Sequence, residues 1–261
     1  MGSTMDGQVA IVTGAAQGIG AAIALRLARD GMDVVIADVS VDRLDAVVGE
    51  IRALGRRALP LTIDVTVAAD RERLVTRTVE TFGRLDALVN NAGIQRIASP
   101  LEVTEDHWDA VMGVNAKATY FCCQLTLRHM VAARRGRIVN VASIAGKMAS
   151  TIQHPIYNVS KAAVLAMTKT LALAHAADGV RVNAVCPGVI ATPMQDVVDR
   201  EFAALMGKAP SEVRAERVGR IPVGTIGTPE DVAALVSFLL GPDTHYVTGQ
   251  ALNVDGGLLT Y

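Results

Sequence analysis

Tyr157 and Lys161 are the residues whose types and spacing point most directly to chemistry. They stand at i and i+4 beside the apolar run 162–177, and on a helix this spacing brings two Cβ atoms within about 5–6 Å. A phenol ionises near pH ~10, and a neighbouring ammonium favours the phenolate, so the pair could exchange a proton nearer neutrality. Taken alone, such a pair is more often a packed Tyr beside a solvated Lys, and the rest of the chain must decide.

A glycine-rich stretch follows the first expected strand. Gly14, Gly18 and Gly20 lie within residues 13–20, which lead into a helical pattern. Glycines let the backbone turn tightly and approach a pyrophosphate, which then lies at the helix N-terminus. This strand–turn–helix context, with an acid about twenty residues further on, predicts a dinucleotide site.

That acid is Asp38, at the end of the second expected strand. Its carboxylate could accept hydrogen bonds from the adenosine ribose and would repel the 2′-phosphate of NADP. The turn residues Ala15, Ala16 and Gln17 supply no positive charge to balance such a phosphate, and Arg43 is within reach only in principle. We therefore predict NAD as the cofactor.

Apolar strand-length runs alternate with helical patterns along the chain. The expected strands are 8–13, 33–38, 57–64, 86–90, 137–143, 180–186 and 251–254, and the expected helices are 18–29, 41–54, 68–82, 105–134, 155–177 and 229–239. This alternation predicts an α/β fold, a single-domain Rossmann-type doubly wound parallel sheet of about seven strands with helices on both faces. Residues 7–261 would form the domain, and residues 1–6 read as a tag remnant and N-terminal lead.

Residues 192–223 are the exception to this alternation. They mix charges with methionines and prolines, and their helical signal is broken. A long segment beyond the carboxyl end of a strand is usually functional. We expect a substrate lid here, with a plain surface excursion as the alternative.

Composition narrows the class of protein. The chain has 261 residues, is 51% hydrophobic and carries a net charge of −1, which gives no reason to expect nucleic acid or a membrane surface as a partner. Its three cysteines suit neither a disulfide framework nor a metal site, and its five histidines lack ligand spacing, so we expect no metal. No secretory signal or membrane span is apparent, and we expect a cytoplasmic protein.

The sequence resembles the short-chain dehydrogenase/reductase family from about residue 7 to residue 257. The resemblance rests on the glycine turn, on the stretch 90–93 (Asn-Asn-Ala-Gly), on Pro187-Gly188 and on four separate residues in the family's order, Asn115, Ser143, Tyr157 and Lys161. Each motif alone is weak, but their combination at the expected strand ends is specific.

The resemblance implies a catalytic role for each of those four residues. Tyr157 would be the general acid/base, and Lys161 would lower its pKa and hold the nicotinamide ribose. Ser143 would stabilise the developing alkoxide on the substrate oxygen. Asn115 would hold a water that relays the proton outward.

It also implies the residues that contact the cofactor. These would be Gly14, Gln17, Gly18, Ile19, Gly20, Asp38, Asp64, Val65, Asn90, Asn91, Ala92, Gly93, Tyr157, Lys161, Pro187, Gly188, Val189 and Thr192. For Asn90, a structural role in the turn is as plausible as cofactor contact.

The substrate side is less legible. Ser143 and Tyr157 would contact the substrate, joined by Gln95, Gln153 and Met194. Other residues before Tyr157 could edge the pocket; His154 could equally cap a helix, and Lys147 reads better as a solvated loop charge.

Within the family, the carboxyl-terminal third looks most like acetoin (2,3-butanediol) and polyol or sugar dehydrogenases. We therefore expect an NAD-dependent oxidoreductase interconverting a secondary alcohol and a ketone on a small polyol, sugar or diol. A 3-oxoacyl-[acyl-carrier-protein] reductase and an alicyclic or steroid alcohol dehydrogenase are the alternatives, and a non-catalytic dinucleotide sensor is the alternative from another class. Family analogy also implies a homo-oligomer, expected as a tetramer, in which helices 105–134 and 155–177 pair across a two-fold axis.

Overall fold

The computed structural model describes residues 5–148 and 154–260, and its centre is a seven-stranded parallel sheet. The strand order is β3-β2-β1-β4-β5-β6-β7, so the direction of winding reverses between β1 and β4. The strands are β1 (Val9–Thr13), β2 (Asp33–Asp38), β3 (Ala58–Thr62), β4 (Ala87–Asn90), β5 (Gly136–Val141), β6 (Val180–Pro187) and β7 (Ala251–Val254). The predicted doubly wound sheet is confirmed.

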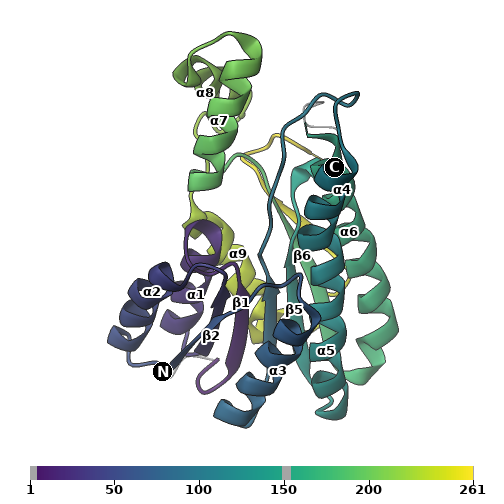
Figure 1. The fold of residues 1–261 in the computed structure, drawn as a ribbon. Coiled ribbons are helices and arrows are strands. Elements are labelled where there is room, and N and C mark those ends of the chain that lie inside the picture. Colours follow the sequence, from purple (N-terminus) through teal and green to yellow (C-terminus); the bar gives the residue numbers. More distant parts are fainter. Residues whose placement is uncertain (1–4, 149–153, 261) are drawn as a thin grey trace.

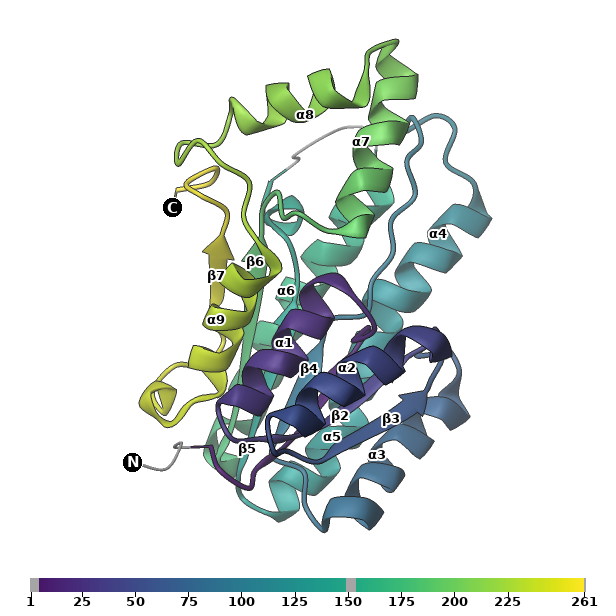
Figure 2. The same ribbon diagram turned by 90° about the vertical axis from the view of Figure 1, so that its left-hand side faces the viewer.

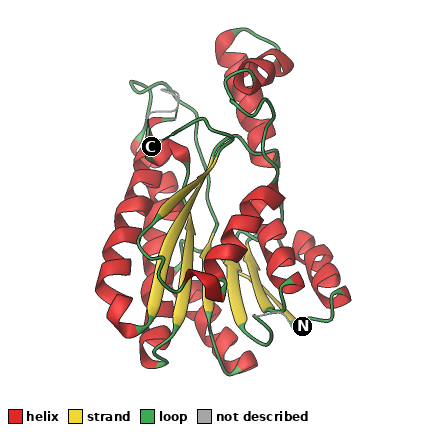
Figure 3. Cartoon of the chain, turned by 180° about the vertical axis from the view of Figure 1, so that it is seen from behind, coloured by secondary structure: helices red, strands yellow, loops and turns green. Residues whose placement is uncertain are grey.

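Helices cover both faces of this sheet (Figures 1 and 3). On one face lie α1 (Gly18–Arg29), α2 (Val41–Ala53) and α9 (Pro229–Leu240). On the other lie α3 (Ala68–Phe82), α5 (Thr119–Ala132) and α6 (Pro155–His175), with α4 (Glu105–Met112) preceding α5.

The alternation of side chains along β1 shows how one sequence serves both faces. Ala10 and Val12 pack under α1 and α9, whereas Val9 and Ile11 pack under α5 and α6, and all four are fully buried. A strand buried on both sides needs a continuous apolar run, and the five residues of β1 provide it.

The expected helix 105–134 is interrupted. Between α4 and α5 the chain forms a π-helical turn, Gly113–Ala118, with the buried Asn115 at its centre. The Asn115 side chain hydrogen-bonds both backbone groups of Ile94, each at 2.9 Å, which offsets the poorer backbone geometry of this turn. Apolar periodicity gives no sign of one inserted residue, and π-bulges of this kind are frequent at functional sites.

Residues 192–223 also differ from the sequence-based expectation of a broken helical segment. They form two regular helices, α7 (Pro193–Met206) and α8 (Pro210–Val218), which extend beyond the sheet in Figures 1 and 2. The break in the pattern is the corner between them, where Gly207 adopts φ +63° and Pro210 begins the next helix.

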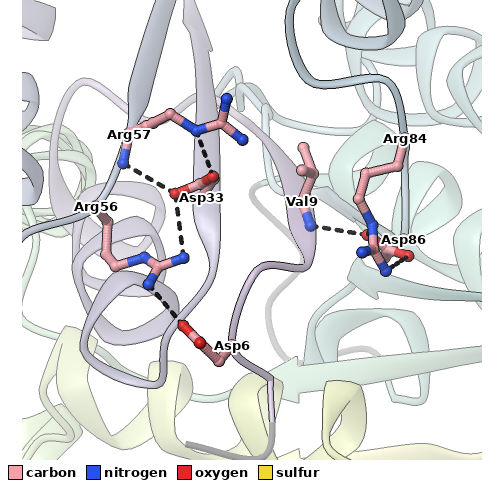
Figure 4. Close-up of polar contacts among 7 residues, drawn as sticks. All are labelled: Asp6, Val9, Asp33, Arg56, Arg57, Arg84 and Asp86. Atoms are coloured by element: carbon pink, nitrogen blue, oxygen red, sulfur yellow. Dashed lines mark hydrogen bonds and ion pairs between the residues drawn. The ribbon is translucent and has the colours of Figure 1, made fainter.

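Two aspartates at the amino-terminal end of the sheet, Asp33 and Asp86, make hydrogen bonds and ion pairs with neighbouring segments (Figure 4). Asp33 at the start of β2 accepts the Arg57 backbone N–H at 2.9 Å and pairs with the Arg57 guanidinium at 2.7 Å. Asp86 accepts the buried N–H of Val9 at 2.9 Å and pairs with Arg84 at 2.7 Å. These contacts satisfy backbone groups that lie beyond the ladder.

The three cysteines, Cys122, Cys123 and Cys186, are free and buried. Burial raises the pKa of the Cys122 thiol to about 12 and that of Cys186 to about 11. Within residues 5–148 and 154–260, no helix combines the length and the apolarity that a membrane span requires.

Candidate active site

A cavity of about 720 Å³ opens at the carboxyl ends of the strands. It spans the point between β1 and β4 where the strand order reverses, which is where open α/β sheets bind ligands. Residues from the glycine turn line one end, and residues from α7 and α8 line the other. The cavity therefore joins the glycine turn to the residues of α7 and α8.

The glycine turn has no room for larger residues. A Cβ on Gly14 would lie 2.8 Å from the Ala92 Cα, and one on Gly20 would overlap the Gly14 carbonyl oxygen. The Asn91 side chain closes the turn by donating to the carbonyls of Thr13 at 3.0 Å and Gly14 at 2.9 Å.

The N-terminus of α1 faces this end of the cavity. Its N-cap residue, Gln17, makes no side-chain capping bond, and the first turn carries no acid. Backbone N–H groups of an uncapped helix start attract phosphate oxygens. The turn and the helix start thus fit the pyrophosphate of a dinucleotide.

Asp38 lies beside this turn and is held in place. Its carboxylate accepts the N–H of Ala16 at 3.1 Å and the N–H of Ser40 at 3.0 Å. Two donors leave lone pairs free on the side that lines the cavity. Arg43 hydrogen-bonds the side chain of Gln17 rather than Asp38.

Ser143, Tyr157 and Lys161 meet in the middle of the cavity. The Tyr157 hydroxyl is hydrogen-bonded to Ser143, whose Oγ accepts the N–H of Ala145 at 3.1 Å. Lys161 is buried, its Nζ lies 5.6 Å from the centre of the Tyr157 ring, and it donates to the Val141 carbonyl at 2.8 Å. The predicted helix-face pair is real, and it lies against the end of β5.

Burial sets the protonation of this pair. It raises the pKa of Tyr157 to about 12, opposed by the hydrogen bond from Ser143, and it lowers the pKa of Lys161 to about 8. The Tyr157 pKa is therefore above its ordinary value, because desolvation of the phenolate outweighs the hydrogen bond from Ser143, and the lowering of this pKa by Lys161 stays a prediction. At neutral pH the phenol keeps its proton.

Asn115 stands behind this group rather than in the cavity wall. Besides its bonds to Ile94, its Nδ2 donates to the Ser160 Oγ at 3.0 Å, and that hydroxyl donates to the Tyr157 carbonyl at 2.8 Å. Asn115 thus links the loop after β4 to the helix that carries Tyr157 and Lys161.

Asn90 does not reach the cavity. Its side chain points to the face of the sheet that α5 covers, where its Nδ2 donates to the Asn140 Oδ1 at 2.9 Å and to the Cys123 Sγ at 3.2 Å. Successive strand residues point to opposite faces, and the lining position falls to Asn91. The predicted cofactor contact of Asn90 is therefore replaced by a structural role.

Most of the remaining predicted residues line this same cavity, and their contacts with cofactor or substrate stay predictions. The cavity is lined by Gly14, Gln17, Gly18, Ile19, Gly20, Asp38, Asp64, Val65, Asn91, Ala92, Gly93, Gln95, Pro187, Gly188, Val189, Thr192 and Met194. Gln153 lies outside the described residues. Lys147 donates to the Ala251 carbonyl at 2.7 Å and to the Asn253 side chain at 2.6 Å, away from the cavity lining.

The far wall is formed by His154 together with Phe202, Val213, Arg217 and Arg220 from α7, α8 and the turn that follows. The sequence offered His154 as a residue that could edge the pocket, with capping as the alternative, but it did not indicate the other four residues. A helical periodicity within each half of 192–223 was the only available signal, because nothing in the sequence says which face of those helices turns toward the sheet.

Comparisons with known proteins agree with this geometry. The family model described as enoyl-(acyl carrier protein) reductase matches residues 14–259. The chain is 40% identical over 255 residues to the 3-oxoacyl-[acyl-carrier-protein] reductase FabG of Thermotoga maritima, covering 98% of this chain and 99% of the relative.

Two solved structures share the whole fold. An actinorhodin polyketide ketoreductase variant with NADPH superimposes with a TM-score of 0.94 at 36% identity, covering 100% of both chains. An NAD+-bound xylitol dehydrogenase superimposes with a TM-score of 0.93 at 32% identity, covering 97% of this chain and 99% of the other.

Fold and site together define an oxidoreductase built on a single Rossmann-like sheet, with a nicotinamide dinucleotide as its cofactor. The chain belongs to the short-chain dehydrogenase/reductase family.

Proposed function

We propose that this chain is an NAD-linked oxidoreductase that interconverts a ketone and a secondary alcohol. The observation that carries the proposal is the convergence of Ser143, Tyr157 and Lys161 on the cavity that the glycine turn opens into. When bound, the nicotinamide supplies or accepts the hydride, and the protein supplies position, polarity and the proton.

Each catalytic side chain has a separate task in this proposal. Tyr157, protonated at neutral pH, gives its hydroxyl proton to the carbonyl oxygen during reduction and takes it back during oxidation. The Ser143 hydroxyl donates to the same oxygen and stabilises the charge that develops there. Lys161 holds the ribose and favours the phenolate once Tyr157 has given up its proton.

Asn115 has a positioning role in the same account. Both N–H donors of its side chain are used, by the Ile94 carbonyl and the Ser160 hydroxyl, and its side-chain oxygen accepts the Ile94 N–H. The backbone carbonyl of Asn115 accepts the Thr119 hydroxyl at 2.8 Å and keeps a second lone pair that would accept a hydrogen bond from a relay water.

Asp38 supports NAD over NADP. A carboxylate that faces the adenosine ribose accepts its hydroxyls and repels a 2′-phosphate. Relatives differ in cofactor, since the similar ketoreductase was solved with NADPH and the similar xylitol dehydrogenase with NAD+. Arg43, held on Gln17 near this end, is the residue that would ease NADP binding.

The substrate pocket favours an apolar body over a sugar. The sequence suggested a small polyol, sugar or diol, but the wall beyond Tyr157 carries Ile144, Val198 and Phe202 as well as Val213. Polyol hydroxyls left without partners against such a wall would be costly. The acyl or alicyclic ketone that was the alternative fits this wall better.

The face of α6 that is expected to form the oligomer interface is exposed to solvent in the single chain. Ala162 and Ala166 on α6 are exposed, and Leu173 on the same helix is 84% exposed, so these side chains do not pack on their own sheet. We retain the homotetramer as a proposal, and a solution mass of four chains by light scattering tests it.

One assay tests the proposed reaction. Purified full-length protein is mixed with NAD or NADP and a panel of diols, polyols, sugars, hydroxyacyl thioesters and alicyclic alcohols, and absorbance of the reduced nicotinamide is followed. NAD-linked oxidation of an alicyclic or acyl alcohol supports the proposal. Binding of NADH without turnover of any alcohol or ketone contradicts it and favours the dinucleotide-sensor alternative.

A further inference from the structure

The wall of the cavity beyond Tyr157 is a continuous row of rings that ends in a guanidinium. The His154 ring lies 5.4 Å from the Tyr157 ring, and the Phe202 ring lies 6.0 Å from the His154 ring. The Arg217 guanidinium carbon lies 5.7 Å from the Phe202 ring centre. All four side chains line the same cavity, so a molecule reacting at Tyr157 extends along rings toward Arg217.

The rings are apolar surface for the body of the substrate. Burial lowers the pKa of His154, whose Nδ1 is paired with the Asn158 side chain at 3.1 Å, so its imidazole is neutral at pH 7. A neutral His between Tyr and Phe adds no charge to the wall. The first charge met along it is at Arg217.

Arg217 is held in position by a buried acid. Its Nη1 lies 3.0 Å from the Asp199 Oδ1, and the same carboxylate oxygen accepts the Gln195 side chain at 2.7 Å. Asp199 is only 3% exposed, and its other oxygen lies 3.9 Å from the Arg214 Nε. The charge of Arg217 is thus largely balanced, and its role at the cavity is to present donors in a fixed direction.

Arg220 supplies the unbalanced charge. It is an exposed residue on the cavity lining, close enough to Arg217 to lower the pKa of that guanidinium, and in residues 5–148 and 154–260 no acid pairs with it. Glu216, an acid on the lining four positions earlier in the chain, is bonded to Lys208. Arg214, the third arginine of this stretch, is bonded to Asp196 at 3.1 Å.

We propose, resting on the proposed function, that the substrate joins an apolar body to an anionic group at its far end, and that Arg220, with Arg217 beside it, binds that group. A carboxylate fits the planar donor forks of two arginines, and its distance from the reacting ketone is set by the ring row. Phosphate groups of a thioester carrier offer the same chemistry from another source. The reaction would then be reduction of an oxo acid to a hydroxy acid, or its reverse.

The experiment compares charged and neutral forms of one substrate. The probes are linear oxodecanoic acids with the ketone at several positions, their methyl esters and their coenzyme A thioesters, assayed with the full chain and NADH. The variants are Arg220→Ala and, as a matched control, Arg200→Ala, which removes an exposed arginine of α7 outside the cavity lining.

We expect wild type to prefer an acid, or its thioester, to the methyl ester by about tenfold or more in kcat/KM, as one charge-assisted hydrogen bond allows. Arg220→Ala should remove most of this preference through KM, and Arg200→Ala should keep it. Loss of preference for the free acid assigns a carboxylate, and loss confined to the thioester assigns a carrier phosphate.

Two results overturn the inference in different ways. Equal turnover of acid, thioester and ester by wild type refutes the anionic group, and a preference that survives Arg220→Ala refutes the binding of that group by Arg220; both results leave the proposed reaction intact. No NADH- or NADPH-linked turnover of any ketone in the series or in the alcohol panel refutes the proposed function, and this inference with it.

Discussion

The Asn115 amide and the Ser160 hydroxyl are joined by a buried 3.0 Å hydrogen bond between the π-helical turn and α6. The same amide holds the backbone of Ile94, in the loop that lines the cavity after β4. One side chain therefore fixes two walls of the active site relative to each other. The π-helical turn is the local cost of placing it there.

Replacing Asn115 by Ala should reduce both stability and activity. The substitution leaves the N–H and carbonyl of Ile94 without partners, which costs about 1–3 kcal/mol of unfolding free energy for each buried group left unsatisfied. Chemical denaturation and kcat measured on the same preparation check this. As a control, Lys117→Ala, an exposed change in the same turn, should alter neither quantity appreciably.

Replacing Asp38 by Ser should relax the discrimination against NADP. Removing the carboxylate removes its repulsion of the 2′-phosphate, and we expect the NADP-to-NAD ratio of kcat/KM to rise about tenfold or more. Asp42→Ser, an exposed change of equal charge in the first turn of α2, is the control. An unchanged ratio in Asp38→Ser would show that Asp38 does not face the ribose.

Replacing Lys161 by Met should change how stability depends on pH. The folded-state pKa of about 8 lies below the ordinary 10.5, so the folded state releases its proton first as pH rises between these values. The unfolded state then binds more protons, and wild-type stability gains with pH in this window. Below pH 8 the buried charge opposes folding by about 3 kcal/mol, at about 1.4 kcal/mol per pKa unit.

The measurement is the difference in unfolding free energy between Lys161→Met and wild type, from pH 7 to pH 10.5. We expect the stability of the variant relative to wild type to be nearly constant below about pH 8 and to fall from there to pH 10.5, whatever constant offset the lost bond to Val141 adds. Lys169→Met, an exposed change on the same helix, should give a flat difference. A flat difference for Lys161→Met would show that the ammonium is not desolvated.

Replacing Asp86 by Ala should lower the unfolding free energy of the protein without lowering its kcat. The change strands the fully buried Val9 N–H and removes the partner of Arg84, so we expect a loss of about 2–4 kcal/mol. Asp86 lies at the opposite end of the sheet from the cavity, and kcat at 25 °C should stay the same. Glu80→Ala, which breaks an exposed 3.5 Å pair with Arg77, should cost under about 1 kcal/mol in the same denaturation experiment.

The sequence predicted the strands and most helices because buried parallel strands and amphipathic helices leave clear periodic patterns. Strand β3 is shorter than the predicted 57–64, since it is the edge strand and pairs on one side only. The glycine turn, Asp38 and the Tyr157–Lys161 pair were predictable because each is local in sequence and its position follows from the end of an element.

The far wall was not predictable, since its residues meet only through tertiary packing. His154 contacts Phe202 across 48 positions of sequence, and the Arg217–Asp199 pair joins two helices whose relative angle depends on the corner at Gly207. The π-helical turn was not predictable for a similar reason, because Ile94, the partner that stabilises it, is 21 residues from Asn115. Such contacts leave no period in the chain.

The most direct test of the central claim is to replace Tyr157 by Phe and to measure turnover and NADH binding on the same preparation. The change removes the hydroxyl and keeps the ring against His154, so the fold and the dinucleotide end of the cavity should be unaffected. We expect kcat to fall by about two to four orders of magnitude while the Kd for NADH stays within about twofold of wild type. Turnover close to wild type, with NADH binding intact, would contradict the assignment of Tyr157 as the proton donor.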